Sequence, residues 1–112
     1  MTMNFDELSE FSKEFKQLSK KYLSLMEDLD EFKKILSAIP LGNSKHFNVI
    51  TRSSGAMIVK ARLFCKYLKG SSLRVIYSYI QQTNTIEFIE LYFKGSKANE
   101  DRERIKYYLS QF

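Results

Sequence analysis

The spacing of the apolar residues changes once along this chain, at Gly42, and the change limits which secondary structures each part can form. Before Gly42, apolar side chains recur every three or four residues, which is the period of one face of an α-helix. After Gly42, apolar and polar residues alternate, which is the period of a β-strand that buries one face. The sequence therefore predicts helices first and a sheet afterwards.

The first part of the chain predicts two helices. One extends from about Asp6 to Lys21, with acidic residues near its start and lysines near its end, as the helix dipole favours. Ser24 and Glu27 have the spacing of a capping box, which predicts the start of a second helix, and Pro40 ends it. Because the link between the two helices is short, we expect them to form a helical hairpin.

The second part predicts four strands, joined by turns at Arg52–Gly55 and Gln81–Asn84 and by an exposed basic loop over residues 66–72. The expected strands are Phe47–Thr51, Met57–Leu63, Leu73–Ile80 and Thr85–Phe93. A last, short helix is expected from an N-cap at Asn99. The predicted class is α+β, in which the helical hairpin and the C-terminal helix pack on one face of a four-stranded antiparallel sheet. We expect a single domain over residues 1–112.

The charges are distributed unevenly along the sequence. Between Glu31 and Glu87 there is no acidic residue, whereas nine lysines and arginines fall in the same window. Residues 41–112 hold twelve basic and five acidic residues, a net of +7, whereas residues 1–40 have a net of −2, so the basic character belongs to the C-terminal two-thirds of the chain. Unrelieved like charge raises the energy of a compact state, so folding alone does not explain this pattern. The sequence predicts a polyanionic partner, with nucleic acid as the leading candidate.

The alternation predicts which basic side chains lie together. Lys60 and Arg62 fall on one face of their strand, opposite the apolar residues expected to pack on the helices. Arg74 faces outward from the next strand, and Lys94 follows the last one. We predict that these four residues form one cationic cluster, which would bind phosphate and stabilise the charge of a transition state. The alternative is that they only protect exposed edges of the sheet.

Further contacts with RNA are predicted around this cluster. Basic side chains would hold phosphates, and tyrosine rings would stack on unpaired bases, although most tyrosines in such strands are core residues. The additional candidates are Arg52, Lys66, Lys69, Tyr77 and Lys97.

Other kinds of site are excluded or disfavoured. His46 is the only histidine, which excludes a two-histidine nuclease mechanism and disfavours a metal site. Glu87 and Glu90 are expected on opposite strand faces, so they would not form a carboxylate pair. We expect no metal and no cofactor. One cysteine, Cys65, and the absence of an apolar run of ~20 residues favour a cytoplasmic chain without a membrane partner.

Several segments of the chain resemble the RelE/ParE superfamily of bacterial type II toxins. They are Phe11–Tyr22, Val59-Lys-Ala-Arg62, Leu73-Arg-Val-Ile-Tyr77 and Leu91-Tyr-Phe-Lys94 followed by a charged helix. The RelE branch of this superfamily consists of endoribonucleases that cut mRNA on the ribosome, with the ribose 2′-hydroxyl of the message as nucleophile. The resemblance implies that activity, a cognate antitoxin protein as partner and mRNA on the ribosome as substrate. A ParE-like gyrase inhibitor and a non-toxic nucleic-acid-binding module stay open as alternatives.

The resemblance also implies roles for individual residues. Lys60 corresponds to a general base and Arg74 to a ligand of the phosphate and transition state, with Arg62 and Lys94 as supporting cations. The chain departs from the family in two places. The family usually opens with a β-strand, for which Met1–Phe5 is too short, and some members use a tyrosine where this chain has Asn99-Glu-Asp-Arg102.

Overall fold

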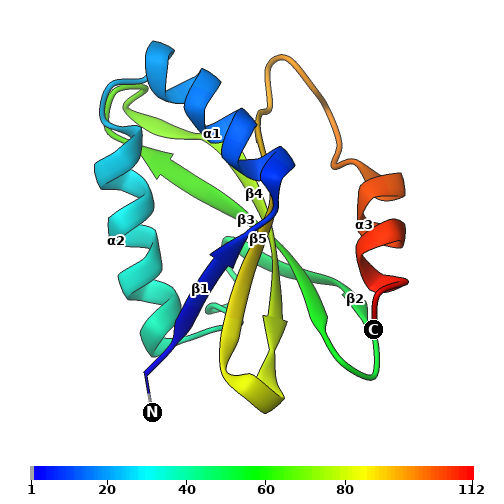
Figure 1. The fold of residues 1–112 in the computed structure, drawn as a ribbon. Coiled ribbons are helices and arrows are strands. Elements are labelled where there is room, and N and C mark those ends of the chain that lie inside the picture. Colours follow the sequence, from blue (N-terminus) through cyan, green and yellow to red (C-terminus); the bar gives the residue numbers. More distant parts are fainter. Residues whose placement is uncertain (1) are drawn as a thin grey trace.

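The computed structural model describes residues 2–112, in which a five-stranded sheet lies between two helical layers (Figure 1). The elements in chain order are β1 (Asn4–Glu7), α1 (Ser9–Lys21), α2 (Leu25–Ala38), β2 (Phe47–Arg52), β3 (Met57–Cys65), β4 (Gly70–Ile80), a short 3-10 turn (Gln81–Thr83), β5 (Thr85–Phe93) and α3 (Arg102–Leu109). The α+β class and the N-terminal helical hairpin are therefore confirmed. No helix in this part of the chain is long and apolar enough to span a membrane.

The sheet has one strand more than the sequence predicts. Its order is β1-β5-β4-β3-β2, and β1 pairs with β5 in parallel, whereas the other neighbours are antiparallel. Four residues are too few for a period of two to be recognised, which is why β1 was missed. It is held by the backbone of β5 and by Phe5, whose ring stacks on Phe88 with centroids 6.2 Å apart.

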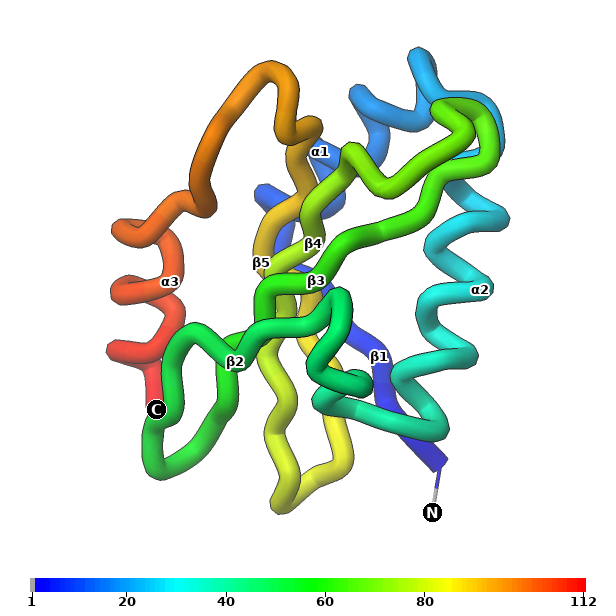
Figure 2. The backbone as a smooth tube through the Cα atoms, turned by 180° about the vertical axis from the view of Figure 1, so that it is seen from behind, coloured from blue at the N-terminus to red at the C-terminus, as the bar shows by residue number. Residues whose placement is uncertain are grey.

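The main core lies between the helical hairpin and one face of the sheet. Phe11, Leu29 and Phe32 of the two helices pack on a face that includes Val75 and Tyr77. These strand residues are the apolar half of the predicted alternation, so the period of two places them correctly. The β3–β4 turn lies beside the α1–α2 link, as Figure 2 shows from behind.

The start of α2 lies where the sequence predicts it, but no capping box forms there. Ser24 has helical backbone angles, φ −86° and ψ −1°, from which its hydroxyl makes no capping hydrogen bond. The hydroxyl instead donates to Asp28 at 2.7 Å and accepts the N–H of Tyr67 at 2.9 Å. Ser24 therefore joins α2 to the β3–β4 turn.

The C-terminal helix corrects the expectation that all helices share one face. α3 lies on the side of the sheet opposite α1 and α2 (Figures 1 and 2). Ile58, Ile76 and Ile89 point to that side and form a second apolar cluster with Ile105 and Tyr108 of α3. These isoleucines lie on the sheet face that points away from the helical hairpin. The apolar patch they form there is covered by α3, which keeps it out of solvent.

The cap of α3 also differs from the prediction. Asp101, not Asn99, is the N-cap, because its carboxylate accepts the N–H of Arg104 at 3.0 Å. The helix begins at Arg102, so residues 94–101 form an irregular connection, which begins with a turn over residues 94–96, between β5 and α3; it is called the 94–101 connection below.

A β-bulge changes the face of the last residues of β5. Ile76 pairs with Glu90 and Tyr77 with Phe88, so Ile89 is an extra residue without a partner on β4. The insertion reverses the alternation and brings Glu87 and Glu90 to the same face, that of α3, which corrects the predicted separation. Glu90 is completely buried there and accepts the N–H of Asp101 at 2.8 Å.

Candidate functional site

The centre of the site is a pair of arginines on the sheet face that does not carry the helical hairpin. Arg62 of β3 lies directly opposite Arg74 of β4, and Lys60 lies one row away, opposite Ile76. This surface, defined by Lys60, Arg62 and Arg74, is called the basic face below. Arg62 and Arg74, the arginine pair, are direct cross-strand neighbours, an arrangement that destabilises a sheet when the charges are alike.

The environment of Arg74 shows the cost of this arrangement. Burial, together with the positive charge of Arg62, lowers the pKa of the Arg74 guanidinium from its ordinary value. Its Nη1 donates to the carbonyl oxygens of Ser71 and Leu73 at 2.6 and 3.3 Å, whereas Arg62 is exposed. Among residues 2–112, neither arginine forms an ion pair. The arginine pair therefore lacks the counter-charge that a bound phosphate would supply.

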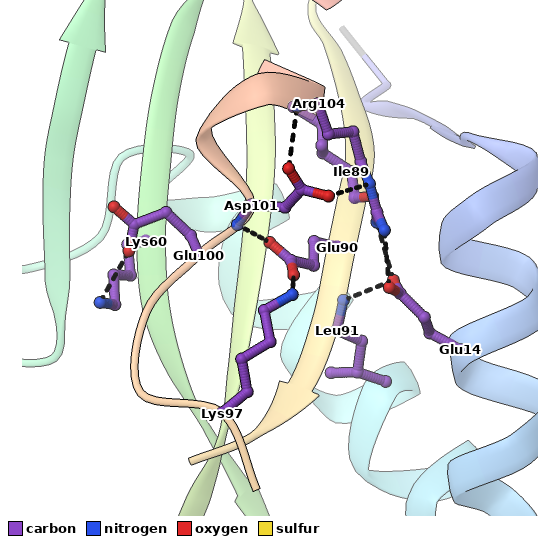
Figure 3. A network of polar contacts seen from close by, with 9 residues as sticks. All are labelled: Glu14, Lys60, Ile89, Glu90, Leu91, Lys97, Glu100, Asp101 and Arg104. Carbon is purple, nitrogen blue, oxygen red and sulfur yellow. Dashed lines mark hydrogen bonds and ion pairs between the residues drawn. The ribbon is translucent and has the colours of Figure 1, made fainter. Parts of the chain in front are cut away.

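Lys60 shares the basic face but is engaged with a carboxylate. Its Nζ lies 2.9 Å from Oε1 of Glu100 in the 94–101 connection (Figure 3). Burial opposes the charged form of Lys60, but the hydrogen bond to Glu100 and the electrostatic effects of Tyr92 and Glu100 outweigh it and raise the pKa of the ammonium. Lys60 is thus held protonated, which does not fit the general base that the resemblance implies.

Glu100 is the site residue that sequence reasoning missed. Its side chain is 8% exposed, and hydrogen bonds from Lys60 and the backbone lower its pKa although burial alone would raise it. The sequence placed Glu100 in the first turn of a helix, where an acid is explained by the dipole. The helix starts two residues later, which frees Glu100 to reach Lys60 across the sheet. The signal in the sequence was an acidic pair, Glu100-Asp101, in the otherwise basic C-terminal part of the chain.

A cavity of about 890 Å³ between β2 and α3 opens onto this ion pair. Lys60 and Glu100 line it together with Asn48, Arg102 and Lys106. The wall that α3 contributes carries Arg102 and Lys106 beside Glu103, so the lining of the cavity holds three basic and two acidic side chains.

Lys94 and Lys97 differ in their surroundings. Lys94 is exposed just after β5. Its backbone N–H donates to the carbonyl oxygen of Ser72 at 2.9 Å, which places Lys94 two residue rows away from Arg74 in the sheet. Lys97 forms an ion pair with the buried Glu90 and lies over the ring of Tyr92, 5.3 Å from its centroid. Its charge therefore neutralises Glu90 in this structure (Figure 3), and contact of Lys97 with RNA stays a prediction.

Tyr77 corrects the predicted set of RNA contacts. Its side chain is completely buried in the main core, on the face away from the arginine pair. Its hydroxyl donates to the carbonyl oxygen of Pro40 at 2.7 Å, and burial raises its pKa. Tyr77 therefore cannot stack on a base without unfolding the core.

The remaining candidates lie at opposite ends of the sheet. Arg52 pairs with Met57 at the start of β3, whereas Lys66 directly follows the end of that strand. Eight residues of strand separate the two ends of β3, roughly 26 Å at 3.3 Å per residue. Lys66 forms an exposed ion pair with Glu27 at 3.6 Å, and Lys69 occupies the following turn. Lys66 and Arg62 line one pocket beside α2, whereas Arg52 lies at the other end of the sheet, away from the arginine pair.

The edge of β5 is closed by side chains where β1 ends. Beyond Phe88, Glu14 of α1 accepts the N–H of Leu91 at 3.1 Å, and Arg104 donates to the carbonyl oxygen of Ile89 at 2.9 Å. Glu14 and Arg104 also form a two-point hydrogen bond, at 3.0 and 2.9 Å (Figure 3). This clasp, Glu14 with Arg104, ties α3 to α1 and thereby positions the 94–101 connection over the basic face.

No family model and no curated protein sequence matches the chain. Among the solved structures that resemble it are two RelE structures. An archaeal RelE–RelB complex from Pyrococcus horikoshii OT3 contains a chain that is 23% identical, with a TM-score of 0.64 over 85% of this chain and 98% of that one. A double mutant of the E. coli toxin RelE in the free state is 15% identical, with a TM-score of 0.63 over 100% of this chain and 99% of that one. At these identities the likeness concerns the fold.

Proposed function

We propose that this protein, which has the RelE-like fold that both likenesses show, is the toxin of a type II toxin–antitoxin system and acts in the cytoplasm as a ribosome-dependent mRNA endoribonuclease. The observation that carries the proposal is the arginine pair. Like charges placed directly opposite each other lower the stability of a sheet, so the arrangement gains a reason when a phosphate lies between them.

The arginine pair suits phosphodiester cleavage by the 2′-hydroxyl of the same RNA. Such a reaction adds negative charge to the phosphoryl oxygens in the transition state, and preorganised cations stabilise that charge more than the charge of the ground state. Arg62 and Arg74 supply this stabilisation, and Lys94 extends it along the backbone of the message. The cations come from side chains, so the proposed reaction is independent of metal.

An antitoxin is the proposed protein partner. One of the similar structures is a complex of RelE with RelB. On this chain, a partner of that kind would bring acidic side chains to the basic face, because opposite charge there relieves the repulsion within the arginine pair. Occupation of the arginine pair by an antitoxin would then exclude the message.

The test is cleavage by the purified protein on translating ribosomes, with the ends of the message mapped. The wild type is expected to cut, and the Arg62→Ala, Arg74→Ala double variant to cut at least 100-fold more slowly. Lys16→Ala with Lys20→Ala is the matched control, because it removes the same charge from exposed positions on α1. Intact messages with a folded wild type would overturn the proposal. Gyrase-dependent DNA breaks with translation untouched would indicate ParE-like activity instead.

A further inference from the structure

The ion pair between Lys60 and Glu100 joins two segments that are distant in the sequence, at a point where a ligand can reach them. The two charged groups are 2.9 Å apart, and their side chains are 22% and 8% exposed. Both line the cavity between β2 and α3. A purely structural ion pair has no need to face a cavity, whereas a pair that exchanges protons with a substrate does.

The pair lies next to the arginine pair. Lys60 and Arg62 are two residues apart on the same face of β3, a separation of roughly 7 Å between their Cα atoms. A phosphate held between Arg62 and Arg74 thus places its own nucleotide beside Lys60 and Glu100. The leaving 5′-oxygen is bonded to the phosphorus of that phosphate, and the attacking 2′-oxygen belongs to the ribose attached to it. Both oxygens therefore come within reach of the ion pair.

We propose that Glu100 is a catalytic residue that takes the proton from the ribose 2′-hydroxyl, and that Lys60 donates a proton to the leaving 5′-oxygen. The inference rests on the proposed ribonuclease function. It reverses the role of Lys60 that the resemblance implies, because the geometry provides a second group, a carboxylate, for the base. The lowered pKa of Glu100 and the raised pKa of Lys60 keep the pair in the forms from which the step starts, a carboxylate and an ammonium. Because these shifts also weaken the carboxylate as a base and the ammonium as an acid, the proposal rests on the placement of both groups at the cavity.

The proposed step balances without any further reactant. The 2′-oxygen forms a bond to phosphorus as its proton passes to a carboxylate oxygen of Glu100. The bond between phosphorus and the 5′-oxygen breaks, and that oxygen receives a proton from Nζ of Lys60. The products are a 2′,3′-cyclic phosphate and a free 5′-hydroxyl. Glu100 and Lys60 are left neutral, and proton transfer across their 2.9 Å contact restores the ion pair.

The competing explanation is that Glu100 merely neutralises Lys60 and blocks the site. The two explanations predict opposite effects of Glu100→Gln, which keeps the shape of the side chain and removes its charge. If Glu100 is the base, the variant is slower by about 10²–10⁴-fold, the usual contribution of general acid–base catalysis. If Glu100 blocks the site, the variant cleaves as fast as the wild type or faster.

The experiment is single-turnover cleavage on programmed ribosomes, with affinity measured separately for a message that carries a 2′-deoxyribose at the cleavage position. Glu100→Gln is expected to lose at least 100-fold in rate with unchanged affinity. Glu103→Gln is the matched control, because Glu103 is exposed on α3 and lines the same cavity. Its rate should stay within about twofold of the wild type.

A modified leaving group separates the two roles. A message with sulfur in place of the 5′-bridging oxygen needs no proton donor, because a thiolate leaves readily. It should restore cleavage by Lys60→Met and leave Glu100→Gln slow. Thermal melting checks that both variants are folded. If Glu100→Gln is unfolded, Glu100→Asp replaces it and is expected to be about tenfold slower, without rescue by sulfur.

The outcomes distinguish the two levels of the proposal. No cleavage by the wild type would overturn the ribonuclease function and this inference with it. Cleavage by the wild type, with Glu100→Gln within threefold or faster, would overturn only the role of Glu100. Rescue of Glu100→Gln by sulfur would assign Glu100 to the leaving group and overturn its role as base.

Discussion

At the scale of single residues, the arginine pair lowers the stability of the sheet and provides a site for a phosphate. Replacing Arg62 by glutamine removes the like charge opposite Arg74, so the protein should become slightly more stable and bind RNA less well. We expect a gain of about 0.4 kcal/mol, at the low end for cross-strand pairs because Arg62 is exposed to solvent. For a chain of this size this corresponds to about 2 °C in melting temperature.

The measurement is thermal unfolding of Arg62→Gln beside Arg52→Gln. Arg52 is also exposed on a strand but lies at the far end of the sheet, so its replacement should leave the melting temperature unchanged within about 0.5 °C if the expected effect is local. A lower melting temperature for Arg62→Gln would show that the arginine pair is stabilising and would remove the main physical argument for a bound phosphate.

The same scale shows which site residues the sequence can predict. The alternation in β3 is regular, so the faces of Lys60 and Arg62 follow from counting, and the pairing of β3 with β4 brings Arg74 beside them. Counting fails in β5, because the bulge at Ile89 is set by packing against α3 and has no signature in the sequence. It fails for Glu100 because the start of α3 decides whether that side chain points along the helix or across the sheet.

At the scale of elements, α3 depends on the clasp formed by Glu14 and Arg104. Replacing Glu14 by alanine leaves the N–H of Leu91 without its acceptor and removes from Arg104 both hydrogen bonds to the carboxylate, so that its guanidinium keeps only Ile89 and Asp101. Because both partners are mostly buried, we expect a loss of about 2 kcal/mol in the free energy of unfolding. Hydrogen exchange of the α3 amides should accelerate, since the helix loses its link to α1.

The control for the clasp is Glu31→Ala. Glu31 forms an exposed ion pair with Lys34 on α2, 3.2 Å apart, which is expected to contribute less than about 0.5 kcal/mol. If Glu14→Ala is no less stable than this control, the clasp does not hold α3, and another contact must position the 94–101 connection.

Elements differ in how far the sequence determines them. Long periodic segments such as α1 and β3 are recognisable because many residues repeat one pattern. β1 has only four residues and exists because β5 offers it an edge. The face that α3 occupies depends on which side of the sheet carries Ile58 and Ile76, a property of the paired strands that the helix sequence does not contain.

At the scale of the whole molecule, each of the two apolar layers buries a tyrosine. Tyr77 lies in the main core, and Tyr108 of α3 donates to Glu87 at 2.8 Å in the second cluster. Burial is the main cause that raises both pKa values above the ordinary value of 10.0. The unfolded chain therefore loses these protons first, so the contribution of the two tyrosines to stability should be constant up to about pH 10 and fall above it.

Denaturant unfolding of the wild type and Tyr77→Phe at pH 7 and above pH 10 tests this. Tyr77→Phe should be less stable by about 1 kcal/mol at pH 7, because the carbonyl of Pro40 loses its donor. Its further loss above pH 10 should be smaller than that of the wild type. Tyr107→Phe is the control, since that ring is 72% exposed. Equal alkaline losses in all three proteins would contradict a contribution from the buried Tyr77.

The charge of the molecule is also divided between its layers, and this division predicts how RNA binding responds to salt. The arginine pair of the sheet is expected to contact the message, whereas the α1 lysines lie in the helical layer on the opposite side of the sheet. Each phosphate contact on single-stranded RNA contributes about −0.7 to the slope of log affinity against log salt concentration. Arg62→Ala with Arg74→Ala should therefore reduce the steepness of this slope by about 1.4. Lys16→Ala with Lys20→Ala, which changes the net charge equally, should leave the slope unchanged. Equal reductions in both double variants would mean that RNA responds to the overall charge, and the arginine pair would then have no special part in binding.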